Sequence, residues 1–499
     1  SFTLSSIIQT MKLGKHIFGV GAMTGVSRIF GFVRDMLIAR VLGAGRLSDV
    51  FLAAFKLPNL FRDLLGEGAL SAIFIPMYTD SKKDEGFAKN VFSWLALGLL
   101  GIAILFEIFM PLVIWILAPG FDADPGKMEL TVTISRIMFI YVIFVCAAAF
   151  LSAVLNAFSR FLLAAFMPVL LNIMLIGALL LSAFYAPGTI LYIMAATVVL
   201  SGIIQVAVLW NRIRRRHFGL RLVIPKWTPG IKSILKRLSI SIVGSGFYQI
   251  TIIVGTLVAS FQSGAVSWLY YCDRIVQLPF AMIGLAVGTV LMSSISNALA
   301  QKNMRSVYIQ QNSSMRRSLM LLMPCVAGLF VLAHPIIKYL FEYGAWTAAS
   351  TQAVAIAIMI QVFVLPAMLI SQIYSKTLYA SQDVKTPVKT SMISLGVAAA
   401  IYLGAFPVMG YLAIPVGIVV SGYLKNYLLG RACRQRGLTK IYSGTMRAIF
   451  AFGALAAVMG GALWFVPINS IWALFAAIAG FGVIYLPAAF IINRHIGTK

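Results

Sequence analysis

The sequence predicts an all-α membrane protein whose chain crosses the bilayer about fourteen times. Three observations predict this class. Apolar residues make up 61% of the 499 positions and charged residues only 11%, whereas an ordinary soluble protein carries roughly 25% charged residues. Apolar runs long enough to span a bilayer recur along the whole chain. The basic residues gather in every second connection between those runs, as they do in polytopic membrane proteins.

Each apolar segment is expected to form one membrane-spanning helix. The fourteen approximate spans are 15–43, 48–79, 90–118, 129–157, 163–186, 188–211, 230–260, 265–300, 313–341, 347–380, 384–407, 411–434, 444–466 and 469–493. Residues 1–10 are expected to be peripheral, with Met11 a candidate native start and no cleavable signal pattern.

Charge alternates between the connections and predicts the topology. Of the 40 Lys and Arg residues, thirty lie in one set of connections, seven lie inside segments, and three lie in the other set: Arg46, Lys127 and Lys338. The rich set is cytoplasmic by the positive-inside rule. Both termini are then cytoplasmic, which requires an even number of spans. The net charge of +26 therefore reflects membrane topology, and no nucleic-acid partner is expected.

An internal repeat divides the chain. SDVFLAAFKLPNLFRDLLGEGALSAIFIP resembles SWLYYCDRIVQLPFAMIGLAVGTVLMSSIS, with Pro58 aligned to Pro279, 221 residues later. Six spans separate the repeats, so both halves insert in the same orientation, as in transporters that rock two bundles about a central site. The predicted regions are an N-terminal lobe, a basic cytoplasmic linker, a C-terminal lobe and two added helices, at residues 11–211, 212–229, 230–440 and 441–499.

Charged residues inside apolar segments mark the predicted functional region, most densely between Ser27 and Pro76. A charge at the bilayer centre costs at least about 2.5–3.5 kcal/mol, so such residues must face a protein interior or a watery cavity. The basic candidates are Arg28, Arg34, Arg62 and, in the second half, Arg274. The acidic candidates are Asp35, Asp49, Glu67 and Asp273.

The surplus of arginine predicts an anionic, phosphorylated substrate, because guanidinium forks bind phosphate oxygens bidentately. Internal ion pairs, Arg28 with Asp35 or Arg62 with Asp49, are the alternative interpretation. On straight helices Arg34 and Arg62 would lie off the shared charged face. The residues expected to let these helices bend are Gly31, Pro58 and Pro279.

No enzyme is predicted. The four histidines are far apart, and the chain has no phosphate-binding GxxxxGK[ST] loop for ATP hydrolysis. The four cysteines have no metal-ligand spacing and are expected to be small buried hydrophobes.

The stretches SRIFGFVRD, ARVLGAG, DVFLAAFKLPNLFRDLLGEGALSAIFIP, SWLYYCDRIVQLP and SQDVKTPVK resemble the MurJ (MviN) lipid II flippases, of the multidrug/oligosaccharidyl-lipid/polysaccharide exporter superfamily. The resemblance covers about residues 11–495. It implies two lobes around a V-shaped cavity, in the bacterial cytoplasmic (inner) membrane. It also implies export of lipid II, the undecaprenyl-pyrophosphate disaccharide-pentapeptide, for peptidoglycan synthesis.

By the same resemblance, Arg28, Arg34, Arg62 and Arg274 hold the pyrophosphate, and the last two helices form a groove for the lipid tail. Asp63 stands where relatives can carry a basic residue. The expected partners are lipid II and membrane lipids, with the chain as a monomer. No cofactor is expected, and the resemblance implies coupling to membrane potential or to a monovalent cation. Asp383 is a weak cation-ligand candidate and equally a helix N-cap.

Three other functions stay open at this point. They are a flippase for another polyprenyl-pyrophosphate-linked glycan, an ion-coupled drug antiporter of the same superfamily, and a non-transporting membrane scaffold. A pump for cationic drugs should expose acidic and aromatic residues in its cavity. The surplus of arginines therefore counts against that function.

Overall fold

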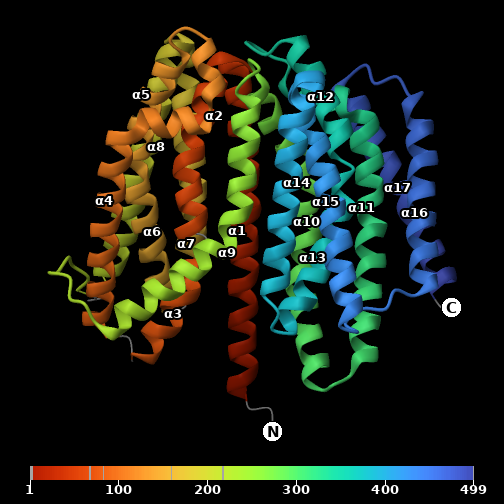
Figure 1. Cartoon of the computed structure of the whole chain (residues 1–499), viewed down its shortest axis with the longest axis horizontal. Coiled ribbons are helices and arrows are strands. Elements are labelled where there is room, and N and C mark those ends of the chain that lie inside the picture. The colour runs from red at the N-terminus through yellow and green to blue at the C-terminus, as the bar shows by residue number, and fades with distance from the viewer. Residues whose placement is uncertain (1–3, 67–68, 82–83, 159, 216–218, 498–499) are drawn as a thin grey trace. The chain divides into compact units, whose positions relative to one another are not determined.

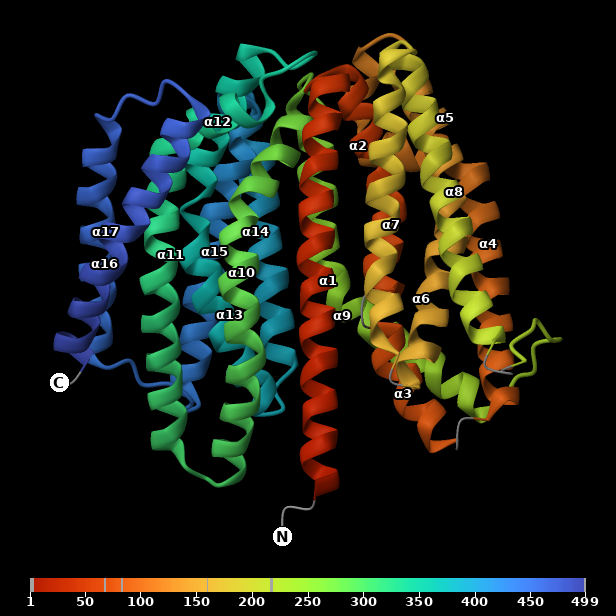
Figure 2. The same cartoon turned by 180° about the vertical axis from the view of Figure 1, so that it is seen from behind.

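All regular structure in the described part of the chain is helical (Figures 1 and 2). The computed structural model describes residues 4–66, 69–81, 84–158, 160–215 and 219–497. The α-helices are α1 (Leu4–Leu42), α2 (Arg46–Phe61), α3 (Ala69–Asp80), α4 (Glu85–Leu117), α5 (Lys127–Phe139), α6 (Tyr141–Ala157), α7 (Phe161–Leu180), α8 (Pro187–Arg214), α9 (Pro229–Ala259), α10 (Ala265–Ala300), α11 (Met304–Phe341), α12 (Ala348–Gln361), α13 (Val364–Ala380), α14 (Lys385–Met409), α15 (Ala413–Gln435), α16 (Ser443–Trp464) and α17 (Ile471–Gly497). Four short turns complete the set: the π-helix η1 (Arg62–Gly66) and the 3₁₀ turns η2 (Pro119–Ala123), η3 (Leu181–Ala183) and η4 (Gly410–Leu412).

The chain divides into two compact units. The first comprises Ser1–Gln249 with Tyr343–Ala345, and the second comprises Ile250–Glu342 with Trp346–Lys499. The division falls inside α9 rather than in the basic linker, because the start of α9 packs into the first unit. Ile231 and Ile234 of α9 are both buried in the core of that unit.

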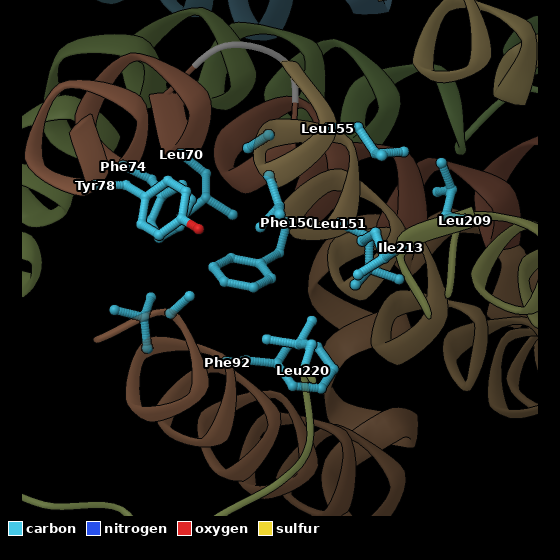
Figure 3. Packing of buried hydrophobic residues seen from close by; sticks show 14 of the residues in the cluster. Leu70, Phe74, Tyr78, Phe92, Phe150, Leu151, Leu155, Leu209, Ile213 and Leu220 are labelled. Atoms are coloured by element: carbon cyan, nitrogen blue, oxygen red, sulfur yellow. The ribbon is translucent and has the colours of Figure 1, made fainter. Parts of the chain in front are cut away.

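The core of the first unit is rich in aromatic rings from α3, α4 and α6 (Figure 3). Phe74 and Tyr78 of α3 stack with ring centroids 5.1 Å apart, and Phe150 of α6 lies 4.8 Å from the ring of Phe74. Phe92 of α4 stacks on the other side of Phe150 at 5.4 Å. Such contacts fix the relative positions of the three helices, because aromatic pairs add directional stabilisation to their buried area.

The basic linker is fastened to α4 by two polar side chains. The amide of Asn90 donates to the carbonyl of Lys226 and accepts from the Lys226 N–H, both at 2.8 Å. The hydroxyl of Ser93 accepts from the Val223 N–H at 2.9 Å. Leu220 of the linker is buried in the core (Figure 3). Between Leu220 and Lys226 the linker therefore packs against the first unit, which its polar composition alone did not predict.

In the second unit, α11 is the element on which the added helices α16 and α17 pack. Ala448, Phe452 and Ala456 of α16 and Tyr485 of α17 form one buried cluster with partly buried methionines of α11. The Tyr485 hydroxyl donates to the Phe452 carbonyl at 3.3 Å. The cores of α10, α11, α13 and α15 meet in a separate cluster that includes Ile295, Tyr374 and Leu429.

The predicted multi-pass helical fold is confirmed. Among the described residues, eight helical runs are long and apolar enough to cross a membrane, and the bent pair α12 and α13, at 43°, would make a ninth. One of the eight runs, Lys385–Gln435, turns back on itself at η4. Ser394 there donates to the Ser421 carbonyl at 2.8 Å, and the ring of Tyr402 packs directly on Gly417.

Candidate functional site

The charged stretch of the first unit is helical up to Pro58 and distorted one turn later. α1 runs through Gly31 without a break, whereas α2 gives way to the π-turn η1 at Arg62. Proline removes a backbone donor from the helix, and the wider π-turn changes the direction of the side chains that follow. The distortion predicted from Pro58 therefore begins at Arg62. Glu67 lies outside the described residues.

Arg34 is buried in a polar cluster between α1 and α7. Its guanidinium contacts the carboxylate of Asp35 at 2.6 Å and donates to the Asn172 side-chain oxygen at 2.9 Å. Asn172 in turn donates to the Ser27 carbonyl at 3.2 Å. Gly31 lies beside the same amide, since a Cβ there would be 3.5 Å from the Asn172 nitrogen. The cluster ties α7 to α1 and holds the Arg34 charge in place.

Asp49 is fully buried in an ion pair at the start of α2. Its carboxylate accepts from the ammonium of Lys127, the first residue of α5, at 2.9 Å. Lys127 is itself only 2% exposed, and its nitrogen lies 4.1 Å from the ring centroid of Phe121. A buried charge needs such compensation, because an unpaired ion in a low dielectric is very costly. Asp49 thus joins α2 to α5.

Arg62 and Asp63 form a half-buried pair on the π-turn. Their side chains meet at 3.2 Å and retain 29% and 36% of their exposure. The other Asp63 oxygen accepts from the amide of Gln249, the last residue of the first unit's share of α9, at 3.3 Å. The pair therefore remains accessible, in contrast to Asp49 and Lys127.

Arg28 differs from Arg34 and Arg62, the other two predicted site arginines of the first unit. It lies on the exposed side of α1 and forms no ion pair with any residue that the structure describes. Neither predicted pair, Arg28 with Asp35 or Arg62 with Asp49, is present, because each carboxylate contacts another cation.

In the second unit, Asp273 and Arg274 contact neutral polar groups. The carboxylate of Asp273 accepts from the amide of Gln361 on α12 at 2.5 Å. The guanidinium of Arg274 donates to the Tyr270 hydroxyl at 2.9 Å and lies 4.8 Å from the centroid of that ring. Arg274 remains exposed. The Tyr270 ring orients the cation.

The remaining predicted positions, Pro279 and Asp383, have local structural roles in the contacts that the structure shows. Pro279 lies inside α10, which continues through it to Ala300. Asp383 accepts from the Thr386 N–H at 3.1 Å and pairs with Arg436. The described part of the chain contains no group of three or more His, Cys, Asp or Glu that could hold a metal ion.

A family model described as "Lipid II flippase MurJ" matches residues 38–481. The chain belongs to this family. A relative from Rhizobium tropici, "Probable lipid II flippase MurJ", is 34% identical over 91% of this chain and 87% of its own length. "Lipid II flippase MurJ" of Burkholderia cenocepacia is 31% identical over 93% of this chain and 92% of its own length. Family membership and the apolar helices together make this a multi-pass protein of the bacterial inner membrane.

Solved structures agree on the fold. "Lipid II flippase MurJ, inward closed conformation" matches with a TM-score of 0.81 at 23% identity, over 96% of this chain and 99% of the other. An inward-facing multidrug resistance MATE family transporter of the MOP superfamily matches with a TM-score of 0.67 at 16% identity, over 82% and 94%. Both likenesses confirm the polytopic helical fold.

Sequence reasoning missed the partners that hold the charged residues: Lys127, Asn172, Gln361 and Tyr270. Lys127 counted only as one of three basic residues in sparsely charged connections. Asn172 and Gln361 are polar residues in apolar runs, which was the available signal, since a buried amide must be hydrogen-bonded.

Proposed function

We propose that this protein moves lipid II from the cytoplasmic to the periplasmic leaflet of the inner membrane by alternating access. Membership in the MurJ family supports the substrate, because the relatives' names specify lipid II. The exposure of Arg28 and Arg274 is the observation that carries the role of the arginines. Each lies on a long helix within the predicted charged region of its own unit, where an exposed cation is costly unless it meets water or an anion.

The four arginines have different tasks in this proposal. Arg28 and Arg274 bind the pyrophosphate directly, because their guanidinium groups are accessible. Arg62 turns from Asp63 to the phosphate, which its half-exposed position supports. Arg34 is buried, so it acts through its positive electrostatic field and by fixing α1 through its contacts with Asp35 and Asn172. Asp35, Asp49, Glu67 and Asp273 balance these charges and gate the cavity.

The proposed topology has fourteen spans with both termini in the cytoplasm. The apolar run Lys385–Gln435 counts as two spans in this topology, because it forms the helical hairpin of α14 and α15. The bent pair α12 and α13 supplies one, and so do α1, the α2–α3 pair, α9 and α10. Residues 11–211 and 230–440 form the two repeated lobes around the 212–229 linker, and residues 441–499 form the tail groove. The working unit is a monomer.

The substrate headgroup needs a shielded path, because each phosphate charge would be costly in hydrocarbon. With the cavity open inward, the arginines attract the pyrophosphate while the prenyl tail stays in lipid. Rocking of the lobes about Gly31 and about Pro58 with its π-turn then exposes the headgroup outside. Membrane potential or a monovalent cation supplies the driving force, and no cofactor takes part.

Growth of a strain depleted of its own lipid II flippase tests the function. The wild-type chain should restore growth, and alanine at Arg28, Arg34, Arg62 or Arg274 should abolish rescue at equal membrane abundance. The matched control is Arg136→Ala, which removes another exposed arginine from α5. Failure of the wild-type chain to rescue while it reaches the membrane would refute lipid II as substrate. Full rescue by all four variants would refute the proposal that these arginines bind the pyrophosphate.

A further inference from the structure

A small cavity lies within the second unit, between the last turns of α11 and the connection from α16 to α17. Its volume is about 270 Å³. His334, Lys338 and Tyr339 of α11 line one side, and Trp464 at the end of α16 lines the other. The remaining lining residues are apolar, and none of the lining residues carries a carboxylate. This cavity shares no residue with the arginines of the proposed transport site.

Lys338 is the basic residue that distinguishes this place. Arg46 and Lys127, the other two basic residues of the sparsely charged connections, both contact carboxylates, Asp124 and Asp49. Lys338 has no ion pair with any residue that the structure describes, and its side chain is exposed. The nearest carboxylate along the chain, Glu342, accepts from the Thr351 hydroxyl at 2.6 Å and is thereby directed toward α12.

The two nitrogen-bearing side chains of the cavity lie on the same face of α11. His334 and Lys338 are four residues apart, the spacing at which helical side chains are neighbours. Neighbouring ammonium and imidazole groups gain from a shared anion, because phosphate oxygens accept charge-assisted hydrogen bonds. The Tyr339 hydroxyl donates to the Ile468 carbonyl at 3.1 Å and holds the α16–α17 connection against α11.

Trp464 supplies the apolar side of the cavity. It is 59% exposed at the end of a membrane helix, next to Leu463 and before the exposed Phe465. Tryptophan is enriched at the level of lipid headgroups, where its ring meets acyl chains and its N–H meets water. The cavity thus places an ammonium group and an imidazole donor beside an apolar surface at a helix end, an arrangement that suits a phosphorylated lipid.

We propose that this cavity binds the phosphate of a lipid headgroup in the outer leaflet. The leaflet assignment rests on the proposed topology, which places the end of α11 on the periplasmic side. His334 and Lys338 contact the phosphate, and Trp464 contacts the start of the lipid chain. The phosphate can belong to a polyprenyl pyrophosphate that has crossed the membrane or to an anionic phospholipid of that leaflet.

Native mass spectrometry of the full-length protein tests the site with three probes: undecaprenyl pyrophosphate, dioleoyl phosphatidylglycerol and uncharged dioleoylglycerol. The double substitution His334→Gln with Lys338→Gln should weaken binding of at least one phosphate-bearing probe by about tenfold or more, since it removes charge-assisted hydrogen bonds. Binding of dioleoylglycerol should not change. Lys338→Arg, which keeps the charge, should retain most of the affinity.

The matched control is Arg305→Gln, which removes the same charge from the other end of α11. Arg305→Gln should not change the affinity for whichever phosphate-bearing probe the wild-type protein binds more tightly. A selective loss of undecaprenyl pyrophosphate identifies the exported lipid as the occupant, and a selective loss of phosphatidylglycerol identifies a phospholipid. Unchanged affinity for both probes in the double variant would overturn the proposal. Rescue of the flippase-depleted strain is scored separately, so a chain that binds these lipids but fails to rescue would refute the proposed function and leave this site standing.

Discussion

The stretches that follow Ser48 and Ser267 are aligned by the predicted repeat, yet they differ in two respects. The first stretch is divided into α2, the π-turn at Arg62 and α3, whereas the second continues as the single helix α10. The first sets its charges against opposite charges, as in Asp49 with Lys127. The second sets its charges against neutral polar groups, with Gln361 on Asp273 and Tyr270 on Arg274.

The difference shows that one repeat can serve two purposes. Ion pairs in the first stretch join neighbouring helices, so those charges contribute to stability as well as to the site. In the second stretch the hydroxyl and ring of Tyr270 orient the exposed guanidinium of Arg274. Each of the following predictions tests one part of this contrast.

The largest expected effect follows from breaking the buried pair of the first stretch. Asp49→Asn leaves the Lys127 ammonium buried without its counter-ion and should lower the free energy of unfolding by about 3–5 kcal/mol. Thermal unfolding of the purified protein measures this. Adding Lys127→Met to Asp49→Asn should restore most of the loss, because the uncompensated charge is then removed.

The control for that experiment is the exposed pair of Arg46 with Asp124, in the same unit. Their side chains are 48% and 33% exposed, with 3.6 Å between the charged atoms. Asp124→Asn should cost no more than about 1 kcal/mol, as exposed pairs do. Equal losses for Asp49→Asn and Asp124→Asn would contradict the assignment of Asp49 to a buried structural pair.

One arginine from each unit should separate stability from function. Arg34→Ala leaves the Asp35 carboxylate buried without the guanidinium, so it should lower the free energy of unfolding by about 3 kcal/mol. The same variant should also fail to rescue growth. Arg274→Ala removes an exposed side chain and should cost about 1 kcal/mol or less while it also abolishes rescue. Unfolding midpoints and growth are measured on the same variants. A large loss of stability in Arg274→Ala would remove the proposed distinction between the two halves.

The amide of Gln361 gives the next smaller effect. Gln361→Leu removes the donor to Asp273 and should lower stability by about 1 kcal/mol, the scale of one lost hydrogen bond at a partly buried acceptor. In an Asp273→Leu background the same substitution should cost clearly less. If the two losses simply add, the hydrogen bond contributes nothing to the position of Asp273.

The two aligned prolines should have the smallest and most unequal effects. Pro279→Ala should preserve rescue and raise stability by about 1 kcal/mol, because α10 is continuous and alanine favours a helix interior. Pro58→Ala should reduce rescue, since it favours a regular helix where the π-turn now redirects Arg62. Growth curves and unfolding midpoints again decide. Equal behaviour of the two variants would show that the π-turn has no role in transport.

Much of the fold was predictable from apolar runs, because helix length and hydropathy are local properties of the chain. The distortion near Pro58 was predictable too, but the same residue type at Pro279 leaves α10 unbroken. Packing around each proline decides between these outcomes, and packing is not a local property. The partners of the charged residues could not be found from spacing, since Lys127, Asn172 and Gln361 lie 78, 138 and 88 positions away from Asp49, Arg34 and Asp273.

In the proposed mechanism, arginines of both halves bind the pyrophosphate of lipid II. Binding of purified lipid II to the full-length protein in detergent, compared among wild type, Arg28→Ala, Arg274→Ala and the control Arg136→Ala, tests it most directly. Loss of a charge-assisted contact should weaken binding by about tenfold or more in the first two variants and leave the control unchanged. Wild-type affinity in both Arg28→Ala and Arg274→Ala would contradict the claim.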